Sequence, residues 1–398
     1  MHRSARLIPA AALVGAAALR QCSLDGGPQH TPAEGRYLRA LAGAPRSLYL
    51  RVAEVDDAAL GSVPRMRALY VEDASGASAP GAPPAHAPYA PPAPGASARL
   101  RIAQYNMNVL FGPEFQAPHP SAASMHEVLA RANADVLLLQ EAAQQTFPDE
   151  PRYRSGWFAR LSAEDARARV AELHALLLAQ GYSLVQVNGP FNPALLATRL
   201  PIIAVGESFS LDAPPRAPTD ETRGARRVLV SLGPGVGALA LVATHLHHTE
   251  RGCRGVRAAE ARALLAHLRQ QEALEATLAP LPAGLPLRAT VLATDMNGTR
   301  RQDYTEREWA VLARSLGRAG EPALDGVAEL LGGEGWACTY DAGAGAPAFT
   351  HWSGQTVDYA WVKQARGGVR ALGAWALRTP LSDHLPVVHD LDIAHSVP

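Results

Sequence analysis

The chain has 398 residues, of which 47% are hydrophobic and 19% charged, and its formal net charge at pH 7 is zero. This size and composition predict one large or two smaller globular domains, and the charge balance excludes a surface that is basic all round and attracts nucleic acid. Lys363 is the only lysine, which excludes a Gly-Lys-Ser/Thr phosphate-binding loop. Three widely spaced cysteines indicate neither a disulfide framework nor a cysteine zinc site: Cys22, Cys253 and Cys338.

The first 24 residues have features of a targeting segment. Arg3 and Arg6 precede an apolar run from Leu7 to Leu19, which is too short for a comfortable membrane span. The pattern is typical of a secretory signal, which would direct the protein to the periplasm or out of the cell, and also of an organellar transit peptide. A frayed tail on a cytoplasmic protein is a third interpretation that the sequence leaves open.

A tract rich in proline, alanine, glycine and serine divides the chain at residues 74–99. Such a tract buries too little apolar surface to order itself, so it predicts a linker. It separates a small N-terminal region, residues 25–73, from a domain that we expect to cover residues 100–395. The sequence does not indicate a role for residues 25–73.

From Leu100 onward, segments typical of strands and helices follow one another at irregular intervals. Capped and amphipathic segments predict helices at residues 124–132, 162–180, 257–278, 305–316 and 323–331. Apolar runs predict strands at residues 100–110, 135–140, 182–187, 194–198, 201–210, 227–232, 238–244, 288–294, 356–362, 369–377 and 386–392. This irregular mixture favours an α+β fold with much sheet over regular βαβ repeats.

Carboxylate and amide side chains occur where several predicted strands end. Magnesium prefers such hard oxygen ligands, so Glu141 and Asn106 are candidate metal ligands. Taken singly, Glu141 also fits a solvated strand end. Asn106 and Asn108 share a strand face and also fit a pair at a sheet edge.

Other polar residues suggest acid–base chemistry. Asp295 and Asn297 follow an apolar strand and share one face, where an aspartate can orient and deprotonate water and an asparagine can hold it or a phosphate. An Asx turn is the alternative. His245 could donate to a phosphoryl oxygen as negative charge develops. Asp358 lies between apolar neighbours and needs a partner, for which His384 is the natural choice.

Two further patterns are less specific. His247 alternates with His245, but no His-Glu-x-x-His or Cys/His array accompanies them, so a zinc site is disfavoured. Arginines that could bind a phosphate bidentately cluster near the candidate residues, although solvated surface arginines are the alternative in so arginine-rich a chain: Arg199, Arg223, Arg226, Arg227, Arg251, Arg254, Arg300 and Arg301.

The candidate residues belong to an ordered series of short motifs. The series is Gln104-Tyr105-Asn106, Leu139-Gln140-Glu141, Thr198-Arg199-Leu200-Pro201-Ile202, Thr244-His245-Leu246, Thr294-Asp295-Met296-Asn297, Val357-Asp358-Tyr359 and Ser382-Asp383-His384-Leu385-Pro386-Val387. In order and spacing it resembles the endonuclease/exonuclease/phosphatase superfamily, over about residues 100 to 393.

The resemblance implies a four-layer αββα sandwich with its site at one end of two sheets. It implies a bound Mg²⁺, with Mn²⁺ as a substitute, held by Asn106, Glu141 and Asp383. It assigns five catalytic residues: Asp295 activates water, Asn297 positions it or the phosphate, His245 stabilises the phosphoryl charge, and His384 pairs with Asp358. Phosphate binding falls to Arg199, Asn192, His245 and Asn297, although Asn192 lies two positions earlier than the family pattern places this amide.

We therefore expect a magnesium-dependent phosphoester hydrolase. A phosphodiesterase acting on nucleic acid or a related phosphodiester by in-line attack of water is the first interpretation. A sphingomyelinase-like activity on phospholipid, or a phosphatase of inositol phosphates or small molecules, is the alternative. A non-catalytic binding module on the same fold is the alternative of another class. We expect a monomer without a stable membrane span, whose partner is its phosphoester substrate.

Overall fold

The structure is a computed structural model that describes residues 83–107, 122–142, 163–187, 194–211, 223–248, 255–278, 285–304, 306–342, 350–351, 355–377, 382 and 384–395. The targeting segment expected at residues 1–24 and the small region expected at residues 25–73 lie outside the described residues. Both stay predictions.

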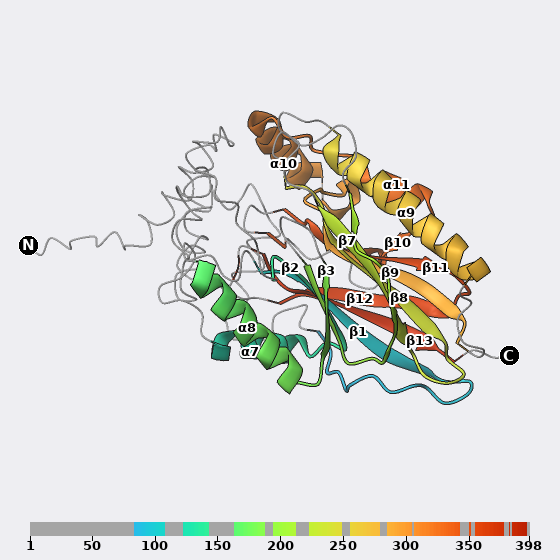
Figure 1. Ribbon diagram of the computed structural model, residues 1–398. Helices are drawn as coiled ribbons and strands as arrows, with labels where there is room; N and C mark the ends of the chain where they lie inside the picture. The colour runs from blue at the N-terminus through green and yellow to red at the C-terminus, as the bar shows by residue number, and fades with distance from the viewer. Residues whose placement is uncertain are drawn as a thin grey trace, which may run out of the picture.

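The first of two central sheets has six strands in the order β12-β13-β1-β2-β4-β3 (Figure 1). Its strands are β1 (Ser97–Asn106), β2 (Val136–Gln140), β3 (Ser183–Val187), β4 (Ala194–Thr198), β12 (Val369–Ala376) and β13 (Val387–Ala394). β1 runs parallel to β2 and antiparallel to β13, whereas β4 runs antiparallel to β2. β1 therefore lies in the middle of the sheet, where both of its edges are hydrogen-bonded.

The second sheet has seven strands in the order β10-β11-β9-β8-β7-β5, and β6 pairs with β7. Its strands are β5 (Ile202–Val205), β6 (Phe209–Ser210), β7 (Gly224–Ser231), β8 (Ala238–His245), β9 (Leu287–Asp295), β10 (Ala337–Cys338) and β11 (Asp358–Gln364). β8 and β9 are parallel and every other pair is antiparallel. β8 and β9 lie in the middle of this order, and like β1 each of them ends on a candidate site residue: Asn106 on β1, His245 on β8 and Asp295 on β9.

Helices cover the outer faces of both sheets (Figure 1). α7 (Ala122–Ala132) and α8 (Ala163–Ala179) lie on the first sheet, and α9 (Val256–Leu278), α10 (Glu306–Ala319) and α11 (Val327–Gly333) lie on the side of the second. Two short 3₁₀ helices, η3 (Arg301–Asp303) and η4 (Thr339–Asp341), belong to connections. The chain is an α+β protein with two sheets between two helical layers.

Three apolar clusters hold these layers together, because each layer buries one apolar face against the next. Leu173 and Leu177 of α8 pack on the first sheet, and Leu264 and Leu268 of α9 pack on the second. The third cluster fills the space between the sheets with inward residues from both of them: Leu100, Ile102, Val136, Leu138, Val228, Val230, Leu239, Leu241, Val291 and Val362. The four-layer αββα sandwich expected from the sequence is confirmed.

The elements agree with the sequence prediction in type and differ in detail. The single strand expected at residues 201–210 forms two short strands, β5 and β6. The last helix begins at Val327 rather than at residue 323, because Gly326 has a left-handed backbone with φ of 81° directly before it. The short strand β10 was not predicted. Among the helices that the structure describes, none combines the length and the apolarity that a membrane span requires.

Part of the tract expected to be a linker lies against the sandwich. The backbone N–H of Tyr89 and the Nε2 of His86 both hydrogen-bond the carboxylate of Asp135, at 2.8 Å each. The Tyr89 hydroxyl donates to the carbonyl oxygen of Leu232 at 3.0 Å. Residues 83–96 therefore contact both sheets, and β1 already begins at Ser97.

Burial of His389 on β13 generates a prediction about stability. The side chain is fully buried, its Nδ1 lies 2.8 Å from the Thr339 hydroxyl, and burial lowers its pKa from 6.5 to about 3. Between pH 6.5 and about pH 3, the unfolded chain binds a proton at this residue and the folded chain does not. The free energy of unfolding therefore decreases as the pH is lowered through this range. The slope from this one group is about 1.4 kcal/mol per pH unit.

We predict that His389→Gln loses this slope. Urea unfolding at about pH 6 and about pH 4 should show a smaller fall in unfolding free energy for the variant than for the wild type. His126→Gln is the matched control, since His126 is exposed on α7 and should leave the wild-type slope intact. Equal slopes in wild type and His389→Gln would contradict the prediction.

Candidate active site

The residues of the candidate site come from strands whose inward faces change from apolar to polar at one end of the sandwich. Alternate strand residues share a face, so Leu100 and Ile102 in the inter-sheet cluster are followed on β1 by inward-facing Gln104 and Asn106. The same alternation on β2, β8, β9 and β11 turns four further polar residues inward, all of them buried: Gln140, His245, Asp295 and Asp358.

Strand register places these residues at the same edge. Asn106 is paired with Gln140 across β1 and β2. Asp295 is paired with His245 on β8 on one side and with Asp358 on β11 on the other. Each sheet therefore brings its polar residues side by side at one end.

Hydrogen bonds join the two sheets at this end. The Nε2 of Gln104 donates to Asp358 Oδ1 and to Gln140 Oε1, both at 2.7 Å. The Nδ2 of Asn106 donates to Asp295 Oδ2 at 3.0 Å. Sequence analysis gave no role to Gln104 or Gln140, although a glutamine on the inward face of an apolar strand was a usable signal, because a buried amide needs partners.

Asp295 is the centre of the cluster and is fully buried. Its Oδ2 lies 3.0 Å from Asn106 Nδ2, 3.3 Å from His245 Nε2 and 3.6 Å from His384 Nε2, and its Oδ1 accepts the backbone N–H of Asn297 at 2.8 Å. Burial alone would raise the pKa of Asp295, but the positive charge of His384, the charge and hydrogen bond of His245, and the hydrogen bond from Asn106 together hold it well below its usual range. Asp295 is thus held as an anion.

His384 and Asp358 form the pair expected from the sequence. The Nδ1 of His384 lies 2.9 Å from Asp358 Oδ2, so this nitrogen donates and Nε2 is directed toward Asp295. The backbone N–H of His384 donates to the Ser382 hydroxyl, which in turn donates to the carbonyl oxygen of Asn106 at 2.8 Å. The ring of His351, which sequence analysis missed, packs 4.5 Å from that of His384.

His245 is held between an arginine and an amide. Its Nδ1 lies 3.3 Å from Nη1 of the buried Arg223, and its Nε2 lies 3.0 Å from Asn297 Nδ2. A guanidinium and an amide nitrogen both only donate, so Arg223 and Asn297 each present a donor to one ring nitrogen of His245, and Nε2 also lies beside Asp295. Of the arginines that the sequence grouped together, Arg223 is the one that contacts a candidate catalytic residue in the described part of the chain.

Backbone strain coincides with the site. Among the described residues, three non-glycine residues have a left-handed backbone, and two are candidate site residues: Glu141 with φ of 53° and Asn297 with φ of 51°. Such conformations are costly for side chains other than glycine and persist where the surroundings impose them. At Asn297 the imposing contacts are the bond from its N–H to Asp295 and the bond from its Nδ2 to the Leu246 carbonyl oxygen, at 3.1 Å.

Glu141 and Asn106 fit a magnesium ion by their chemistry and their proximity. Glu141 is half-buried and its Oε1 lies 3.4 Å from Asn106 Nδ2. The Glu141 carboxylate and the amide oxygen of Asn106 are hard oxygen ligands of the kind that magnesium prefers. A second group, Asp295, Asp358 and His384, offers ligand atoms within 4.8 Å of one another. It includes an imidazole, which magnesium disfavours, so the oxygen pair fits the ion better.

One predicted residue does not reach the site. Arg199 follows β4, and the end of β4 at Thr198 is paired with Val136 at the start of β2, whereas the site lies at the other end of β2. The separation is roughly 13 Å of strand. The Arg199 guanidinium instead lies 4.4 Å from the ring centre of Tyr182, so the structure does not bring it to the other candidate residues, and its role in phosphate binding stays a prediction. Asn192 and Asp383 lie outside the described residues.

Comparison with protein-family models and with curated proteins gives no match. Solved structures do match. The chain is 16% identical to ANGEL2, a 2′,3′-cyclic phosphatase, with a TM-score of 0.48 over 75% of this chain and 96% of that one. It is 15% identical to an endonuclease/exonuclease/phosphatase protein from Bacteroides vulgatus, with a TM-score of 0.47 over 74% and 99%.

The human Nocturnin catalytic domain with bound sulfate is 18% identical, with a TM-score of 0.45 over 74% of this chain and 94% of that one. At such identities a likeness concerns the fold, and the activities of these proteins are their own. The strand order, the four layers and the ordered polar residues at one end are on the other hand properties of this chain. In fold, the chain is similar to these solved structures.

Proposed function

We propose that the protein is a metal-dependent phosphoester hydrolase in which water attacks phosphorus in line. One observation carries this proposal: the buried anion of Asp295 is surrounded by two histidines, the side-chain amide of Asn106 and the backbone N–H of Asn297 at one end of the central strands. A carboxylate is buried in this way only where hydrogen bonds and positive charge compensate its lost hydration.

Asp295 is proposed to orient the attacking water. Its low pKa makes it a weak base, so its first contribution is to accept a hydrogen bond from water and align the oxygen with phosphorus. As the new P–O bond forms, the water becomes more acidic and its proton moves onto Asp295. The bond between phosphorus and the leaving oxygen breaks in the same step, opposite the water, and the leaving oxygen departs with the bonding electron pair and takes a proton from solvent water.

The negative charge that develops on the phosphoryl oxygen is proposed to be stabilised by His245 and Asn297, with Arg223 holding His245 in place. The Nε2 of His245 and the Nδ2 of Asn297 lie 3.0 Å apart, so one phosphoryl oxygen between them can accept hydrogen bonds from a protonated Nε2 and from the amide. Arg223 holds the His245 ring from the other side, with its Nη1 3.3 Å from Nδ1. His384, oriented by Asp358, stabilises the anion of Asp295 while the substrate is bound.

Glu141 and Asn106 are proposed to hold Mg²⁺, or Mn²⁺ in its place, together with Asp383. When bound, the ion would supply Lewis-acid stabilisation of a phosphoryl oxygen. Glu141 supplies a negative charge and Asn106 a neutral oxygen, which leaves coordination positions for water and substrate, as magnesium requires.

For the substrate we propose a phosphodiester, with nucleic acid as the first candidate. The zero net charge argues against unaided binding of duplex DNA, which depends on a basic surface, so single strands are favoured over duplex. Phospholipids of the sphingomyelin type and inositol phosphates carry the same reacting group and are the alternatives. Plasmid DNA, single-stranded RNA, sphingomyelin and inositol phosphates, each with magnesium and with chelator, separate these classes.

We predict that Asp295→Asn lowers hydrolysis of bis-p-nitrophenyl phosphate at least about 100-fold in kcat/KM, because an amide cannot accept the proton of the water. Asp392→Asn is the control, since Asp392 on β13 pairs with the exposed Arg370 and has no contact with the site. Thermal unfolding of both variants shows that they fold. Unchanged magnesium-dependent hydrolysis by Asp295→Asn would refute the assignment.

A second prediction concerns the metal. Glu141→Gln removes the charged ligand and should weaken magnesium binding at least about tenfold in calorimetry, a loss of about 1.4 kcal/mol. His384→Gln should not weaken it. If His384→Gln weakens binding and Glu141→Gln does not, the ion belongs to the group of Asp295, Asp358 and His384 instead.

A further inference from the structure

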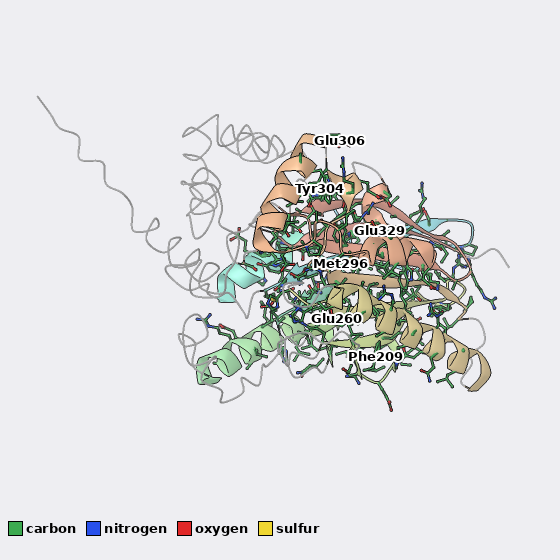
Figure 2. All side chains as sticks on the ribbon, turned by 90° about the horizontal axis from the view of Figure 1, so that it is seen from above. Phe209, Glu260, Met296, Tyr304, Glu306 and Glu329 are labelled. Carbon is green, nitrogen blue, oxygen red and sulfur yellow. The ribbon has the colours of Figure 1, made fainter. Side chains whose placement is uncertain are left out.

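The N-terminal end of α9 contacts the loop that follows β8. Glu260, at the start of the second turn, is buried, and its Oε2 accepts the backbone N–H of His247 at 2.8 Å. His247 is two residues beyond His245, so the carboxylate of Glu260 fixes the backbone that carries His245 out of β8. Figure 2 labels Glu260 near the N-terminal end of α9 and Met296 at the end of β9.

The first turn of α9 also holds the loop that follows β9, through a buried ion pair. The Nε of Arg257 donates to Asp325 Oδ2 at 2.7 Å, and Asp325 Oδ1 accepts the backbone N–H of Val327 at 3.1 Å. The Asp325 carboxylate lies directly on the backbone of Gly298, because a Cβ added there would be 2.8 Å from Asp325 Cγ and closer still to its Oδ2. Glycine is therefore required at position 298, because any Cβ there would overlap the Asp325 carboxylate.

The two loops meet at Asn297. Its Nδ2 donates to the carbonyl oxygen of Leu246 in the β8 loop, and its own backbone is left-handed. The residues after it are fixed in turn, since the Thr299 hydroxyl donates to the Ala323 carbonyl oxygen at 2.8 Å, two residues before Asp325. The strained position of Asn297 thus depends on what holds its neighbours.

We propose that Glu260 and the Arg257–Asp325 pair are positioning residues for His245 and Asn297. Neither carboxylate touches a reacting atom. Each fastens one loop to the N-terminal two turns of α9, so that a single helix sets the distance between the His245 imidazole and the Asn297 amide, which are proposed to donate to the phosphoryl oxygen. This inference rests on the proposed function. It predicts that losing either contact lowers kcat and leaves KM nearly unchanged, because misplacement acts on the transition state.

A double-mutant cycle tests the contact at Gly298. Gly298→Ala pushes the Asp325 carboxylate away, and Asp325→Ala removes it, so each should lower kcat at least about tenfold with KM within about threefold. Because both act through one contact, the double variant should be no worse than the worse single one. Losses that multiply, or single variants with wild-type kcat, would overturn the proposal.

The contact of Glu260 is tested by a conservative replacement. Glu260→Gln keeps an oxygen that can accept the His247 N–H, whereas Glu260→Ala does not. The glutamine variant should keep kcat within about threefold of the wild type, and the alanine variant should lose at least about tenfold. Equal kcat in the two variants would exclude positioning through this hydrogen bond.

Glu334→Gln is the matched control, because it breaks an ion pair between α9 and the residue that follows α11, away from the site, with Arg269 Nη1 2.7 Å from Glu334 Oε1. It should leave kcat unchanged. Amide hydrogen exchange of residues 296–300 gives a second readout that needs no substrate: Asp325→Ala should speed it and Glu334→Gln should not. A wild type that hydrolyses nothing would refute the proposed function alone, whereas equal exchange in both variants would refute the positioning role.

Discussion

The structure depends on how one buried carboxylate, that of Asp295, is compensated. An ionised carboxylate removed from water costs several kcal/mol unless hydrogen bonds and opposite charge replace its hydration. The compensating groups, Asn106, His245 and His384, come from β1, from β8 and from the segment before β13, so they belong to both sheets. The anion can therefore be buried only when both sheets are correctly placed, and the geometry that makes the site also favours one arrangement of the sandwich.

This constraint explains the division of each central strand into two parts. Most of the inward face is apolar and joins the sheets by burial, while the last inward positions are polar and join them by hydrogen bonds such as that from Gln104 to Asp358. The polar positions contribute less apolar burial. Their hydrogen bonds instead fix the orientation of the side chains, since a hydrogen bond specifies angle as well as distance. Chemistry at phosphorus needs that directionality, because attack must be in line.

Much of this was predictable from the sequence, because the information was local. Alternation along an apolar strand assigns a face, so Asp295 and Asn297 could be placed together, and Asp358 could be matched with His384 as a buried carboxylate in need of a partner. The position of Arg199 was not predictable from local pattern: Glu141 and Arg199 both follow apolar strands, but β2 and β4 are antiparallel, so the two residues lie at opposite ends. Strand direction, like the contact between α9 and the two loops, follows from tertiary pairing that no local pattern records.

The docking of residues 83–96 has a mechanical consequence. Tyr89 bonds the first sheet through its N–H on Asp135 and the second through its hydroxyl on the Leu232 carbonyl oxygen, at the ends of β2 and β7 that lie away from Asp295. Prolines in this segment restrict its unfolded conformations, so docking it loses less entropy than docking a flexible chain. Hydrogen bonds therefore connect the two sheets at both ends, and non-directional apolar packing fills the space between those ends. Together they resist a sliding of one sheet over the other, which would separate Asn106 from Asp295.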